Sequence, residues 1–180
     1  MKTHIVLLRG VNVLGHNRLP MKSFADILAG MGFANVRTYI QSGNALIDSA
    51  TTLDGGAVRR IGQEIHAVHG FAPAVLLLDG RALQHAVAAN PFATDNGKAL
   101  HCFFLESAPE QPDMARLQSL KAPSESFALI GLVFYLHTPD GFGRSKLAAA
   151  VESALGVKVT ARNWNTIRQL TAMLGQSGAP

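Results

Sequence analysis

Residues 36–48, with the sequence VRTYIQSGNALID, place two short strands next to each other in the chain. Apolar and β-branched residues dominate 36–40 and 45–48, and such a composition is typical of strands. Between them, Ser42-Gly43-Asn44 is a hairpin signal, because Gly and Asn accept the positive φ angles of tight turns. The stretch therefore predicts an antiparallel hairpin at the centre of the first half of the chain.

The elements around this hairpin follow the order β-α-β-β-α-β, with one more helix after them. Short apolar runs predict strands, and apolar residues spaced three or four apart predict helices. Pro20 suits the first turn of a helix and Gly32 its end. The expected elements are a strand at 4–8, helices at 20–31 and 58–68, a strand at 74–78 and a helix at 81–89.

The second half repeats this order. Its expected elements are a strand at 100–105, a helix at 113–120, hairpin strands at 127–130 and 132–136, a helix at 147–155, a strand at 157–160 and a helix at 164–174. Residue identity between the halves is negligible, so the duplication rests on element order alone. The sequence thus predicts an α+β fold of two ferredoxin-like βαββαβ units in tandem, each followed by an extra helix.

The predicted domain boundaries follow from this repeat. Asn, Pro and Gly cluster between the halves, as in a linker, and the chain end is expected to fray. The expected parts are a first half at 1–90, a linker at 91–97, a second half at 98–175 and a tail at 176–180.

Composition narrows the protein class. The chain has 180 residues, of which 48% are hydrophobic and 16% charged, so a sizeable core is expected. Its formal charge is 16 − 12 = +4, which suits phosphate or nucleic-acid ligands without demanding them. Cys102 is the single cysteine, which excludes an intrachain disulfide and a cysteine-based zinc site. No stretch approaches the ~20 apolar residues of a membrane helix. A cytoplasmic protein with no membrane partner is therefore expected.

The predicted topology gathers polar residues into two clusters. In a βαββαβ unit, the loop after strand one meets the hairpin turn, and the loops after strands three and four meet each other. The first rule brings together Arg9, Asn12 and Asn17 with Ser42 and Asn44. The second rule brings together Arg144, Ser145 and Lys146 with Arg162, Asn163 and Asn165.

The second cluster predicts an anion site. Gly143-Arg144-Ser145-Lys146 and Arg162-Asn163 each precede an expected helix, where backbone N–H groups lack intrahelical partners. Cations at a helix N-terminus oppose the macrodipole, and a bound anion would reverse that penalty. The alternative is that Ser145 and Asn163 act only as N-caps while the cations are solvated.

The first cluster contains a glycine-rich loop. Gly10 and Gly15 have the glycine spacing of a Walker loop, but His16-Asn17 stands where Lys and Ser/Thr are needed for phosphate and magnesium. This loop is therefore a structured turn, or a polar-ligand loop that uses Arg9 and Asn17. Ser42-Gly43-Asn44 is interpreted mainly as a turn, with ligand contact left open by its closeness to Arg9.

Several other residues are of types that could form a site. Asp140 is the one carboxylate beside the second cluster and a candidate general base, although Asp is also common in turns. His66 and His69 are three apart on a helix, but without further ligands a solvated face is favoured. Trp164 is interpreted as a core anchor. Four aromatic residues on expected central strands fit either RNA stacking or a buried sheet: Phe103, Phe104, Phe134 and Tyr135.

Short segments distributed over nearly the whole chain closely resemble the bacterial domain of unknown function 1697 family. One departure is that the family pattern Gly-Gly-Lys-Asn is replaced by Leu14-Gly15-His16-Asn17, which removes a Lys. The resemblance implies a soluble protein with duplicated ferredoxin-like halves, and it implies no established activity. The matching segments are 8–13, Asn17, 20–21, 38–44, 90–92, 143–147 and 160–166.

The leading hypothesis is a binding site for a phosphorylated small molecule, a nucleotide or a nucleic-acid backbone. Arg144, Lys146 and Arg162 would pair with the anion, while Ser145 and the helix N-termini would donate hydrogen bonds. One alternative is an enzyme that acts on a phosphorylated substrate. Another is a structural or interaction module in which the polar motifs only hold turns. No cofactor and no metal site is predicted, and the oligomeric state is left open.

Overall fold

The computed structural model describes residues 1–93 and 95–176, which form an α+β fold with two four-stranded antiparallel sheets. The chain divides into two compact units. The first comprises residues 1–84 together with the chain from Leu170 onward, and the second comprises 85–169. The helices at 80–88 and 164–175 therefore contribute residues to both units. The predicted tail beyond Gln176 lies outside the described residues.

The first unit holds a sheet with the strand order β2-β3-β1-β4. The central strand β1 pairs antiparallel with β3 and β4, and β3 pairs with β2. This is the order of a ferredoxin-like unit, and the predicted hairpin is its β2–β3 pair. The elements are β1 (Lys2–Arg9), α1 (Met21–Gly30), β2 (Ala34–Tyr39), β3 (Asn44–Ser49), α2 (Gly55–His69), β4 (Ala74–Asp79) and α3 (Gly80–Ala88).

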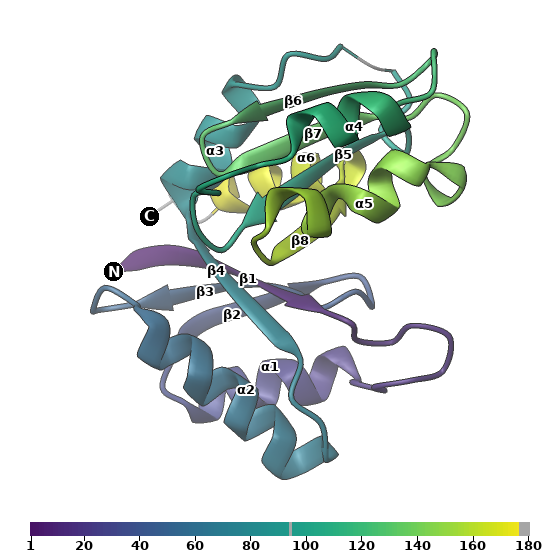
Figure 1. Ribbon diagram of the computed structural model, residues 1–180. Helices are drawn as coiled ribbons and strands as arrows, with labels where there is room; N and C mark the ends of the chain where they lie inside the picture. The colour runs from purple at the N-terminus through teal and green to yellow at the C-terminus, as the bar shows by residue number, and fades with distance from the viewer. Residues whose placement is uncertain (94, 177–180) are drawn as a thin grey trace. The chain divides into compact units, whose positions relative to one another are not determined.

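Helices α1 and α2 cover the same face of this sheet (Figure 1). Every second residue of a strand points to one face, so Val6 and Leu8 of β1 lie in the same core as Ala45 and Ile47 of β3. Phe24 of α1, which is fully buried, also belongs to this core. The helical spacing of the apolar residues thus becomes the contact between helix and sheet.

The second unit repeats the arrangement with the strand order β6-β7-β5-β8. Its core lies between the sheet and helices α4 and α5, and includes Phe103, Phe134 and Leu147. A 3₁₀-helix, η1, stands before α5. The elements are β5 (Leu100–Leu105), α4 (Met114–Leu120), β6 (Ser126–Ile130), β7 (Val133–His137), η1 (Phe142–Arg144), α5 (Lys146–Leu155), β8 (Val159–Asn163) and α6 (Trp164–Gly175).

One strand is longer at its carboxyl end than the sequence predicted. The expected strand stopped at Thr160, whereas β8 runs from Val159 to Asn163 and leads directly into α6. The prediction was wrong because Ala161 and Asn163 have weak strand propensity, and pairing with β5 overrides that preference. Arg162 is therefore a strand residue rather than a residue of a loop before the helix.

The four aromatic residues on the central strands are buried. Phe103, Phe104, Phe134 and Tyr135 are each at most 4% exposed. The Tyr135 hydroxyl donates to the backbone oxygen of Ala86 at 2.7 Å, and burial, followed by the charge of Cys102, raises its pKa to about 12. Bases stack only on exposed rings, so the RNA-stacking alternative does not fit these residues.

Candidate functional site

The first predicted polar cluster forms where the β1–α1 loop meets the β2–β3 turn. The backbone N–H of Leu8 donates to the oxygen of Gly43 at 2.8 Å. The Asn12 side chain donates to the backbone oxygen of Gln41 at 2.8 Å. The topological prediction that these segments lie together is therefore confirmed.

Within this cluster, the asparagine side chains form hydrogen bonds with the backbone of the loops. Asn12 accepts from the backbone N–H of Leu19 and donates to its oxygen, and Asn17 donates to the oxygen of Gly10. Asn44 is fully buried and donates to the Ser42 hydroxyl and to the backbone oxygen of Tyr39. These contacts stabilise the turns and use the donors that a ligand would need. Arg9 is exposed at the end of β1.

The second cluster forms at one end of the other sheet. His137 at the end of β7 pairs with Leu100, and Asn163 at the end of β8 pairs with the next residue, His101. The loops after β7 and β8 therefore start at the same end of the sheet, as the topology predicted, on either side of β5. Arg144 and Lys146 are exposed, and Ser145 is the N-cap of α5, where its hydroxyl accepts from the backbone N–H of Ala148 at 2.9 Å.

The structure does not bring the three cations to one face. Ala161 belongs to the core beneath α4 and α5, so its neighbour Arg162 points to the opposite face of the sheet. Arg162 is 9% exposed, donates to the oxygen of Ala161, and has its pKa lowered to about 10 by burial. The predicted convergence with Arg144 and Lys146 does not match this geometry. The physical reason is that side chains alternate between the two faces of a strand. The strand predicted from the sequence ended before residue 162, so this alternation was not applied to it.

The remaining predicted residues of this cluster also make internal contacts. The Asn163 side-chain oxygen accepts from the backbone N–H of Thr166 at 2.9 Å, so it is the cap of α6. Asn165 accepts from Arg168. Asp140 is exposed and accepts from the Ser124 hydroxyl. That contact ties two loops together, and it favours the turn interpretation of Asp140 over a role as general base.

Beside this cluster lies a titratable group that the sequence interpretation missed. The His101 ring stacks on Phe142 of η1, with ring centroids 3.7 Å apart and planes inclined by 19°. Its Nδ1 is buried and has no hydrogen-bond partner among the described residues. Burial lowers the pKa of His101 to about 4. The ring is neutral at pH 7 and contributes packing rather than charge.

The helix starts differ in one respect that bears on anion binding. In five of the six α-helices in the described ranges, a side chain accepts a hydrogen bond from the first turn. In α1 the preceding residue is Pro20, which has no side-chain acceptor. The first-turn N–H groups of α1 therefore lack such a cap. The capping side chains are Asp54, Asp79, Asp113, Ser145 and Asn163.

A hollow of about 460 Å³ lies at this start of α1. Arg18 and Lys22, both exposed, line it from either side of Pro20, and Asn12 and Gln41 contribute to its wall. The sequence interpretation missed these two cations. The signal was present, since Pro20 offers no side-chain cap and basic residues flank it within two positions.

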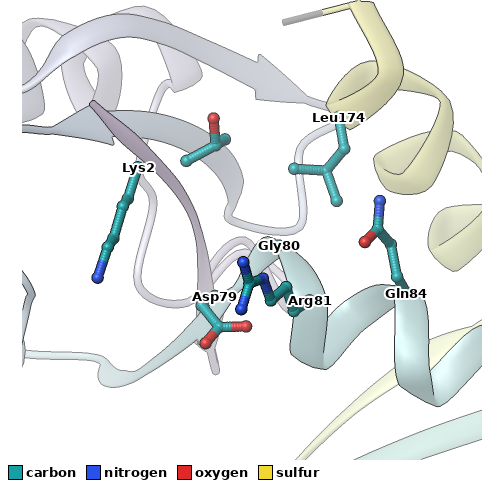
Figure 2. Close-up of a pocket in the computed structure, with 7 residues that line it drawn as sticks. Lys2, Asp79, Gly80, Arg81, Gln84 and Leu174 are labelled. Atoms are coloured by element: carbon teal, nitrogen blue, oxygen red, sulfur yellow. The ribbon is translucent and has the colours of Figure 1, made fainter. Parts of the chain in front are cut away.

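A second hollow, of about 370 Å³, opens at the start of α3. Asp79 and Arg81 lie near each other in it, and Gln84 and Leu174 lie on the side away from Lys2 (Figure 2). The Asp79 carboxylate also caps α3 through the backbone N–H of Ala82. This hollow mixes a carboxylate with two cations, and none of the predicted site residues lines it.

Three further observations bear on the class of protein. Among the described residues, no group of three His, Cys, Asp or Glu side chains is placed to hold a metal ion. Cys102 is buried, and burial raises its thiol pKa to about 12, so the thiol is unreactive in the folded state. Over the ranges 1–93 and 95–176, no helix is long and apolar enough to cross a membrane.

Comparison with known proteins agrees with the resemblance seen in the sequence. The model of the family described as "Protein of unknown function (DUF1697)" matches residues 1–135. The fold is similar to the structure of a conserved bacterial protein from Streptococcus pneumoniae, with a TM-score of 0.76 and 21% sequence identity. The match covers 97% of this chain and 99% of that one. No curated protein matches the chain. The chain belongs to the DUF1697 family, whose function is unknown.

Proposed function

We propose that this member of the DUF1697 family binds a ligand that carries a phosphate group, and that the phosphate lies at the start of α1. The observation that carries the proposal is the contrast among the helix starts. Helix α1 begins after Pro20 and has no side-chain cap, whereas the other five described helices have one. Its first-turn N–H groups are available to an anion.

The charges around this helix start support the same site. Lys22 lies in the first turn and Arg18 lies two residues before Pro20, and both line the hollow there. Cations at a helix N-terminus are unfavourable by about 0.3–1 kcal/mol each, and a bound anion removes that penalty. Lys22 also forms an exposed ion pair with Asp26 at 3.1 Å, which contributes little and leaves its ammonium accessible.

The start of α5 is a second site for the same class of ligand. Arg144 and Lys146 are exposed there, as the sequence interpretation required. Ser145 already accepts from the backbone N–H of Ala148, so fewer unpaired donors remain than at α1. Arg162, Asn163 and Asn165 have internal contacts and are not included in this second site.

A titration of ¹⁵N-labelled protein with inorganic phosphate, and then with ATP, separates the two sites. Shifts in the amide signals of Met21, Lys22 and Ser23 are expected. Shifts confined to residues 146–148 would move the site to α5, and the absence of shifts at both helix starts would contradict the proposal.

Paired substitutions test the contribution of charge. Arg18→Ala with Lys22→Ala is expected to weaken phosphate binding about tenfold or more, because charge-assisted hydrogen bonds contribute roughly 1.5–3 kcal/mol each. Arg59→Ala with Arg60→Ala removes the same charge from α2 and is the matched control. If the control weakens binding equally, the ligand responds to net charge rather than to this site.

A structural role is the second candidate function for the polar motifs. The observation that favours it is the use of Asn12, Asn17 and Asn44 in hydrogen bonds to the backbone of their own loops. In that case Asn44→Ala lowers the free energy of unfolding by about 1–3 kcal/mol, since it removes a buried satisfied amide. The phosphate titration of that variant should stay unchanged. A loss of phosphate binding at unchanged stability would instead assign Asn44 to the ligand.

A further inference from the structure

The first unit has exposed apolar residues at the tips of two adjacent loops, and two of them have strained backbone conformations. Leu14, in the β1–α1 loop, is 93% exposed with φ +47°, and Ile40, in the β2–β3 turn, is 49% exposed with φ +46°. Val13 beside Leu14 is 52% exposed. Positive φ is unfavourable for bulky and β-branched residues, whereas the other three such non-glycine residues in the described ranges are asparagines.

These tips are held in place rather than loose. The Asn12 side chain bonds to the backbone of Leu19 and to the oxygen of Gln41, and so joins the two loops next to Val13 and Ile40. A bridge between Val13 and His16 closes the turn that carries Leu14. The structure therefore orders the backbone while it leaves apolar side chains in water. Strain maintained by its surroundings in this way points to a function.

Two exposed cations lie beside the loops that carry the apolar tips. They are Arg18 and Lys22, and Lys22 is paired with the exposed carboxylate of Asp26. Both cations line the hollow that Asn12 and Gln41 also line. Apolar side chains beside exposed cations match a surface that is apolar within and negatively charged outside.

We infer that this surface, defined by Val13, Leu14, Ile40, Arg18 and Lys22, docks on an anionic phospholipid membrane. The three apolar side chains enter the boundary between headgroups and acyl chains, and the two cations contact lipid phosphates. A protein partner is less suited, because stable protein interfaces bury at least roughly 1,000 Å² and three projecting side chains do not supply that area. This inference departs from the expectation of no membrane partner, which rested only on the lack of a stretch long and apolar enough to span a bilayer. Peripheral docking needs no spanning helix.

The inference shares Arg18 and Lys22 with the proposed function, but its apolar half is independent of it. The two are distinguished by their ligands. If free phosphate binds and vesicles do not, the membrane inference is wrong and the proposed function stands. If vesicles bind and free phosphate does not, the membrane inference stands alone.

Vesicle co-sedimentation of the full chain is the test. Binding is expected to vesicles that contain about one third phosphatidylserine, and to fall at high salt, while phosphatidylcholine vesicles bind more weakly. Equal sedimentation with both vesicle types would overturn the inference. Failure to sediment with either vesicle type would overturn it as well. So would retention by an RNA oligonucleotide in the absence of vesicle binding.

Asparagine substitutions separate docking from folding. Leu14→Asn and Ile40→Asn place a residue that tolerates positive φ, so thermal stability should hold or rise. Vesicle binding should fall about tenfold for Leu14→Asn, because an apolar side chain no longer enters the membrane. Leu132→Asn, at a 49% exposed position in the second unit, is the matched control and should bind as wild type. Wild-type vesicle binding by Leu14→Asn contradicts the inference.

Discussion

At the scale of single residues, burial rather than hydrogen bonding determines how His101 behaves. Its ring packs against Phe142, and burial lowers its pKa to about 4 from the ordinary 6.5. His4 is 5% exposed, and its pKa is lowered for the same main reason, which outweighs the opposing charge of Asp79. Each histidine is therefore neutral in the folded protein at pH 7, and its protonation destabilises the folded state.

The stability of the protein should consequently fall in mild acid. Between pH 6.5 and 4 the unfolded chain binds a proton at residue 101 that the folded chain does not, so the free energy of unfolding decreases as the pH decreases. The loss from His101 reaches about 3 kcal/mol at pH 4 and is complete only below that pH. Urea unfolding at several pH values measures it.

His101→Phe keeps an aromatic ring beside Phe142 and removes the titration, so the pH dependence should flatten. His66→Gln removes an exposed histidine and is the control. An identical pH dependence in wild type and His101→Phe would contradict the assignment.

Two glycines with similar φ allow a second prediction at this scale. A Cβ on Gly43 would lie 2.6 Å from the Cβ of Leu8 and 2.9 Å from the Cγ2 of Val11, whereas one on Gly15 would meet no atom within 4 Å. Gly15→Ala should therefore cost only the backbone strain of about 1–2 kcal/mol. Gly43→Ala should cost at least about 2 kcal/mol more, because the turn must move away from the buried side chains of Leu8 and Val11. Denaturant unfolding of both variants measures the difference, and equal losses would refute it.

At the scale of elements, the segment before β5 is fixed to the start of α6. The backbone N–H of Trp164 donates to the oxygen of Gly97 at 3.0 Å. A Cβ on Gly97 would overlap the side-chain oxygen of Asn165 and lie 2.7 Å from its Cγ and 3.1 Å from its backbone nitrogen. The motifs around residues 90–98 and 163–166, which looked like linker and ligand signals in sequence, are thus in contact with each other.

Gly97→Ala should destabilise the second unit by about 1–3 kcal/mol through overpacking. Adding Asn165→Ala should recover part of that loss, because the overlapping side chain is removed, while the contact with the backbone nitrogen persists. Thermal unfolding of the single and double variants provides the cycle. Strictly additive losses would show that the two residues do not interact.

At the scale of the whole molecule, the same topology occurs twice with almost no shared sequence. Both sheets have the order of a ferredoxin-like unit, and in each the apolar face lies under two helices. The element order was predictable because local periodicity and turn residues determine it. The apolar pattern, rather than particular residues, is what the two units have in common.

The single thiol reports on the second unit within this molecule. Cys102 is buried on β5, and its pKa of about 12 keeps it protonated. Labelling by a thiol reagent at pH 8 should be slow for the folded protein and rise over the same urea range as the fluorescence change of Trp164. Rapid labelling without urea would contradict the burial of β5.

The order of the elements, the antiparallel hairpins and the meeting of the β1–α1 loop with the turn at Gly43 were all predictable, because short-range patterns and turn chemistry specify them. Only the folded structure shows that Arg162 points away from Arg144 and that Asn12 and Asn44 bond to backbone groups. Each of these depends on strand register or on which distant backbone group lies within hydrogen-bond distance. A one-residue change in the extent of a strand reverses the face of a side chain, and no local pattern records it.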